Sequence, residues 1–93
     1  MKNQYLKATK PLFSHERAGE RYTYSLLTLR DGSSSRYGLQ VRLILGEEEY
    51  EAHTGPLFLS RAAAVRFLCA LCRHLVTPSN LPYLIEDILS DFD

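Results

Sequence analysis

The chain has 93 residues, of which 45% are hydrophobic and 24% are charged, and its formal net charge is zero. This length suffices for one domain with a modest core, and the composition is that of a globular chain and excludes a disordered one. No apolar run approaches the roughly 20 residues that a membrane-spanning helix needs, and the N-terminus lacks the apolar segment of an export signal. The sequence therefore predicts a cytoplasmic protein that has no membrane as a partner.

Charge is distributed unevenly along the chain. Residues 1–46 hold eight basic and three acidic side chains, whereas residues 47–93 hold three basic and eight acidic ones, so the halves carry +5 and −5. Either these charges neutralise each other when the halves pack together, or the molecule is electrically polar and attracts a partner or a second copy. The zero total charge argues against nucleic acid as a partner.

Residues 1–20 are predicted to be an irregular lead-in, because turn-forming residues interrupt them. Residues 21–93 are predicted to form a single α+β domain, which opens with two strands. The first strand, residues 22–29, is rich in Tyr, Thr and Leu. The second strand, residues 36–45, alternates apolar and polar side chains, as expected when one face of a sheet is buried.

A third strand follows the second through a two-residue turn at 46–47. With that turn, Leu43 lies opposite Tyr50 on the apolar face of the sheet, and Arg42 lies opposite Glu51 on the polar face. A shift of one residue would destroy both the apolar and the charged pairing. The sequence therefore predicts one register for this hairpin.

Two helices are predicted after the strands. Ser60 is a suitable N-cap for a helix over residues 61–76, and Pro78 breaks that helix. A second helix begins near Ser79, and its apolar residues follow helical spacing. The predicted fold class is α+β: a three-stranded antiparallel meander packed on one face by two C-terminal helices.

Cys69 and Cys72 form a Cys-x-x-Cys pattern within the first predicted helix. A redox-active pair needs a thiol at a helix N-terminus, whereas both cysteines are expected mid-helix on the apolar side. A structural zinc site needs four ligands, and the sequence has no second pair of cysteines. The pattern therefore favours packing cysteines over a thiol or metal site.

The histidines and the acidic run do not indicate a catalytic centre either. His15, His53 and His74 are expected at surface positions, and none has an evident partner that would make it a general base. The glutamates of residues 47–51 diverge from a hairpin tip instead of converging on a cation. No catalytic, cofactor-binding or metal-binding residue is predicted, and a non-catalytic protein is favoured over an enzyme.

The strands are partly apolar on both faces. If the apolar residues of the second strand face the helices, Ile44 and part of the first strand leave a half-apolar outer face. This face is either covered by residues 12–13 or used for association, and the broad apolar arc of the first helix offers another surface. The candidate interaction residues are Leu27, Leu29, Ile44, Val65, Cys69 and Val76.

Two hypotheses about function follow. The first is a small non-catalytic protein-interaction or regulatory module without a cofactor, whose partner is an unidentified protein or a second copy in a homodimer. The alternative is a small enzyme, or a metal or thiol site, that uses Cys69, Cys72 and a histidine. Small size and the lack of motifs favour the first hypothesis.

Three stretches carry a resemblance to known sequences. They are Tyr37–Gly38–Leu39 at the start of a strand, Leu59–Ser60 before a helix, and the connection from Val76 to Leu81 with the amphipathic residues after it. On the basis of these stretches, residues 22–92 resemble a bacterial family of short Firmicutes proteins that is known only as a domain of unknown function. The resemblance implies a shared fold and carries no activity or site residue.

Overall fold

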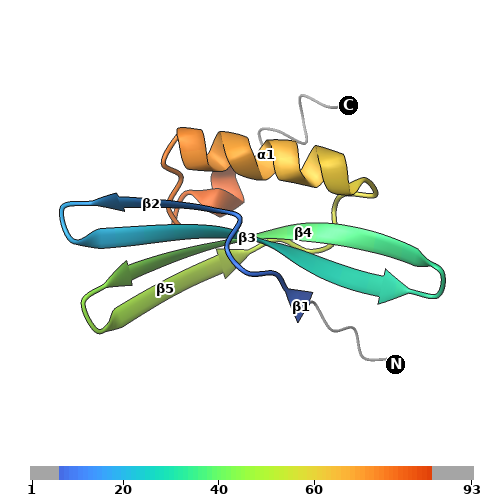
Figure 1. Ribbon diagram of the computed structural model, residues 1–93, viewed down its shortest axis with the longest axis horizontal. Coiled ribbons are helices and arrows are strands. Elements are labelled where there is room, and N and C mark those ends of the chain that lie inside the picture. Colours follow the sequence, from blue (N-terminus) through green and yellow to red (C-terminus); the bar gives the residue numbers. More distant parts are fainter. Residues whose placement is uncertain (1–6, 85–93) are drawn as a thin grey trace.

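A computed structural model describes residues 7–84 of the chain, and in it an antiparallel sheet curls beneath a helix (Figure 1). The elements in the described part are β1 (Lys7–Ala8), β2 (Phe13–Arg17), β3 (Glu20–Asp31), β4 (Ser34–Leu45), β5 (Glu48–His53) and α1 (Arg61–Arg73). Residues 81–84 form a short helical turn after α1.

From β2 to β5, each strand pairs with the next one along the chain. β3 pairs with β4 and β4 pairs with β5, while β1 and β2 both pair with β3. Successive strands from β2 to β5 form three hairpins, whose tight turns lie at residues 18–19, 32–33 and 46–47. The first turn has positive φ at both Ala18 and Gly19, and Gly32 and Gly46 also have positive φ. These backbone angles match the right-handed twist of a hairpin, which explains glycine in each turn.

The structure corrects the predicted fold class. In the described part of the chain the sheet has five strands instead of three, and α1 is followed by only the short helical turn at 81–84. The prediction that the lead-in is irregular is also wrong, because β1 and β2 lie within it. Apolar spacing could not reveal β2, since only Phe13 in this strand is apolar. Most of the second predicted helix lies outside the described residues.

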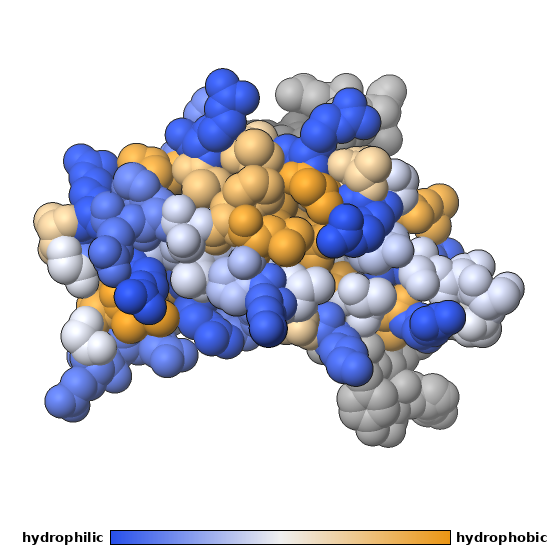
Figure 2. Space-filling view, in the orientation of Figure 1, coloured by the Kyte–Doolittle hydropathy of each residue, from blue (hydrophilic) through white to orange (hydrophobic). Residues whose placement is uncertain are grey.

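The core lies between α1 and the inner face of the sheet. From the sheet, Tyr24, Leu26, Leu39 and Val41 are fully buried; from the helix, Ala64, Leu68 and Leu71 are buried. α1 contacts β2, β3 and β4. Figure 2 shows apolar side chains gathered over the middle of the molecule, where the helix meets the sheet, and hydrophilic ones over the hairpin ends.

A buried hydrogen bond joins the sheet to the end of α1. The Tyr24 hydroxyl donates to the Val76 carbonyl at 2.9 Å, and both residues are buried. Burial raises the pKa of Tyr24, so its hydroxyl remains a donor. The predicted end of the helix near Val76 is three residues too late, because Leu75 adopts a φ of 52° and turns the chain after Arg73. No glycine marks this turn.

The predicted register of the last hairpin is confirmed. Leu43 lies opposite Tyr50, and Arg42 lies opposite Glu51. The Arg42 guanidinium contacts the Glu51 carboxylate at 3.2 Å and the Glu49 carboxylate at 3.8 Å. The N-cap at Ser60 is confirmed as well, since its side chain accepts the Ala63 N–H at 3.2 Å.

Gly38 allows the chain to pass closely over β4 after β5 ends. A Cβ at position 38 would lie 2.6 Å from the Gly55 carbonyl oxygen and 2.9 Å from that of Thr54. The backbone pairing between β4 and β5 extends one residue beyond β5, because the Thr54 N–H donates to the Leu39 carbonyl at 2.9 Å. The chain then bulges and pairs again where Phe58 bridges to Tyr37.

Candidate functional site: the free edge of β5

The backbone of β5 has one edge toward β4 and one edge toward solvent. Hydrogen-bonded and non-hydrogen-bonded pairs alternate along an antiparallel ladder. Because Thr54 bonds to Leu39, the even-numbered residues of β5 direct their backbone groups to β4. Glu49, Glu51 and His53 therefore direct their N–H and C=O groups outward. Within residues 7–84, no other strand pairs with this edge.

The side chains of β5 form two rows. Glu49, Glu51 and His53 lie on the outer face, and Glu48, Tyr50 and Ala52 lie on the inner face. Both carboxylate oxygens of Glu51 accept a hydrogen bond: one from Arg42, and the other from Gln40 Nε2 at 2.9 Å. Four glutamates and one arginine fall within residues 42–53, which gives this hairpin a net charge of −3 with neutral His53.

An open hollow of about 450 Å³ adjoins the inner row. Its floor includes Leu43 and Leu45 of β4, Tyr50 of β5 and Pro78 from the chain after α1, and Glu51 and Ser79 complete its lining. Tyr50 is 47% exposed, and its hydroxyl donates to the Glu48 carboxylate at 3.0 Å. That hydrogen bond raises the pKa of Tyr50. Figure 2 shows a small apolar area beside the tip of this hairpin, between hydrophilic side chains.

The predicted interaction residues do not form one surface. Leu27, Leu29 and Val76 are buried, so they offer almost no exposed area. Ile44 is half-buried on β4, and Val65 and Cys69 are half-buried on α1. Phe13, one of the two residues predicted as an alternative cover for the outer face, lies opposite Tyr24 and packs against the inner core.

The cysteines lie on α1, both half-buried and free. Burial, with a smaller contribution from Cys69, raises the pKa of the Cys72 thiol. A nucleophilic or redox cysteine requires the opposite shift, because the thiolate is the reactive form. Among the described residues, no three His, Cys, Asp or Glu side chains gather in a way that could hold a metal ion.

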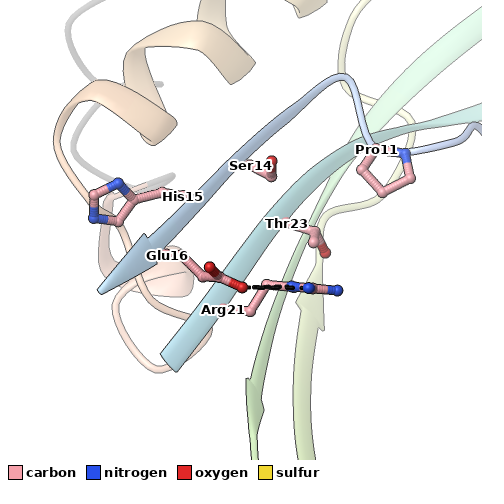
Figure 3. A pocket seen from close by; sticks show the side chains of 6 residues that line it. All are labelled: Pro11, Ser14, His15, Glu16, Arg21 and Thr23. Atoms are coloured by element: carbon pink, nitrogen blue, oxygen red, sulfur yellow. Dashed lines mark hydrogen bonds and ion pairs between the residues drawn. The ribbon is translucent and has the colours of Figure 1, made fainter. Parts of the chain in front are cut away.

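A second hollow, of about 380 Å³, lies over β2 and β3 on the outer face. Figure 3 shows Glu16 and Arg21 paired at this hollow, while His15 points away from them on the other side of β2. The Arg21–Glu16 contact is 3.2 Å, and both side chains are more than half exposed. The His15 ring instead lies 6.1 Å from that of Tyr22. The hollow thus holds a solvated ion pair and brings no general base to a partner.

The sequence alone does not indicate β5 as a site, because a run of glutamates at a hairpin tip is typical of a solvated surface. In the predicted three-stranded meander this strand already lies at one edge; in the structure β5 ends the five-stranded sheet, and its outer backbone groups have no neighbouring strand in the described part of the chain. The predicted register already implies that the side chains of β5 alternate between the two faces and form an outer and an inner row. Position at the sheet edge turns those rows into a candidate surface.

No helix within residues 7–84 has the length and apolar character required to cross a membrane. The resemblance to the short Firmicutes proteins stays a prediction. Comparison of the chain with protein-family models, with curated proteins and with solved structures finds no match.

Proposed function

We propose that this protein is a non-catalytic interaction module that accepts an extended segment of another protein as an additional strand along β5. The observation that carries the proposal is the outward-facing row of backbone groups at Glu49, Glu51 and His53. Strand addition uses such groups for affinity and the flanking side chains for specificity.

The register of β5 makes its edge a suitable template. The turn at residues 46–47 and six consecutive pairs with β4 hold this strand in an extended conformation. An incoming segment would therefore meet donors and acceptors that are already ordered, which lowers the entropic cost of binding. The edge is short, because the chain bulges away after Thr54.

The alternative, a thiol or metal site, receives no support from the surroundings of Cys69 and Cys72. Their half-burial on α1 and the raised pKa of Cys72 agree with a packing role. Self-association stays a prediction that sedimentation at micromolar concentration would test.

Amide hydrogen exchange of the full chain tests the proposal. In the free protein, the amides of Glu49, Glu51 and His53 are expected to exchange fast and those of Tyr50 and Ala52 slowly. Linear peptides selected from a random display library on the immobilised protein should slow the fast set when they bind. If every selected peptide leaves these amides unchanged, the proposal is wrong.

A proline variant separates the backbone from the side chains. His53→Pro removes one outward donor without touching the glutamates, and proline is tolerated at an edge whose N–H faces solvent. We expect this variant to keep its thermal transition and to bind the selected peptides at least about tenfold more weakly than His53→Ala, its matched control. Equal affinity of the two variants would contradict pairing through the backbone.

A further inference from the structure

We infer that the segment accepted by β5 carries an apolar side chain flanked on both sides by lysine or arginine. This inference rests on the proposed function and follows from what the two faces of β5 present to a neighbouring strand. Successive side chains of a strand point to opposite faces of the sheet. Alternate residues of the partner would therefore lie beside the outer row and the inner row.

The outer row requires a basic neighbour. Glu49 and Glu51 lie two residues apart on this face, and a single guanidinium, that of Arg42, serves both. Glu51 already receives two hydrogen bonds. The Glu49 carboxylate lies 3.8 Å from Arg42 Nε, which is too far for a hydrogen bond, so it keeps acceptor capacity. A cross-strand lysine or arginine beside these carboxylates is favourable, and a carboxylate there is unfavourable.

The inner row requires an apolar neighbour. Between the two glutamates, Tyr50 points to the inner face beside the hollow, whose floor includes Leu43 and Leu45. An apolar side chain opposite Tyr50 would cover the exposed part of its ring and reach this floor. Removing such area from water favours binding. The order along the partner is therefore basic, apolar, basic.

The same charges disfavour a second copy of the chain at this edge. Pairing β5 with another β5 would set one row of glutamates against the other row on the outer face. Like charges directly across a sheet are destabilising, and charged edges are a common protection against edge-to-edge pairing. The acidic edge thus selects a basic partner over self-pairing.

Three nonapeptides of fixed sequence, with both termini capped, test the inference on the full chain. One alternates lysine and valine, and one alternates glutamate and valine. The third, the block peptide, has the composition of the first but holds all its lysines in one run and all its valines in another. Fluorescence anisotropy at low and moderate salt should show binding of the alternating lysine peptide at least about tenfold tighter than of the others. Protection of the Glu49, Glu51 and His53 amides should accompany it.

Matched substitutions in the protein test the register. Glu49→Gln should weaken binding of the lysine–valine peptide several-fold and reduce its salt dependence. Tyr50→Ala should weaken it with its salt dependence unchanged. Glu47→Gln, the same charge change in the turn beside β5, should alter affinity less than about twofold.

The outcomes separate the inference from the proposed function. If the glutamate–valine peptide or the block peptide protects the β5 amides and binds as tightly as the lysine–valine peptide, the inference is wrong and strand addition stands. If Glu47→Gln weakens binding as much as Glu49→Gln, attraction is a general effect of the acidic hairpin, and the inference is again wrong. If no peptide of any pattern protects β5, the proposed function itself fails.

Discussion

The two hairpins that share β4 differ in the cover over their inner face. Both have two-residue turns with a glycine at positive φ. In the β3–β4 hairpin, Leu26 lies opposite Leu39, and both are fully buried beneath α1. In the β4–β5 hairpin, Tyr50 lies opposite Leu43 and is 47% exposed. We infer that stability resides in the first hairpin with α1, and that the second is free to serve recognition.

The largest effect is expected at the contact between α1 and the sheet. Leu68 is fully buried, so Leu68→Ala should lower the free energy of unfolding by about 2–5 kcal/mol in urea titrations. Leu59→Ala removes the same atoms at a position that is 73% exposed and should change it by less than about 0.5 kcal/mol. Similar losses for the two variants would contradict a core centred on α1.

Gly38 tests the passage of the chain over β4. Gly38→Ala should cost about 1–3 kcal/mol, because its Cβ meets two backbone oxygens that cannot move aside without shifting the bulge. Gly55→Ala is the control, since nothing lies within 4 Å of a Cβ at that position. Thermal unfolding of both variants checks the difference. A neutral Gly38→Ala would mean that the bulge is loosely held.

The buried hydroxyl of Tyr24 provides a third test. Tyr24→Phe leaves the Val76 carbonyl without its donor and should cost about 1–2 kcal/mol. Tyr50→Phe removes an exposed hydroxyl that bonds to Glu48 and should have almost no effect on stability. Chemical denaturation compares the two, and an equal cost would erase the distinction between the hairpins.

The smallest effect is expected from the ion pairs of β5. Glu51→Gln should change stability by less than about 1 kcal/mol, because the pair with Arg42 is partly exposed and screened by solvent. Urea titration at low and high salt would measure this change. A loss above about 2 kcal/mol would show that β5 is part of the stabilising structure, contrary to our interpretation.

The sequence predicted those parts of the fold in which several signals agreed. Alternating apolar residues, a glycine turn and opposite charges all specified the β4–β5 register, and Ser60 specified the start of α1. β2 escaped prediction because an edge strand can be held by backbone hydrogen bonds and does not need an apolar face. The end of α1 escaped because Leu75, instead of a glycine, adopts the left-handed conformation.

The candidate site could be predicted only in part. Leu27 and Leu29 are candidates in the sequence because they are apolar, but burial is a property of the whole fold, and the structure buries both. The charged and aromatic residues of β5 were visible in the sequence. The predicted meander also places this strand at a sheet edge, but the sequence could not show that β1 and β2 pair with β3 and leave that edge free.

The chain order of the strands also bears on how the molecule folds. Each hairpin joins neighbours in sequence, whereas the Tyr24–Val76 hydrogen bond spans 52 residues. Contacts between close residues form faster than those that close long loops. We therefore expect the β4–β5 hairpin to form before α1 docks, so that the acceptor strand takes its register from the most local interactions of the chain.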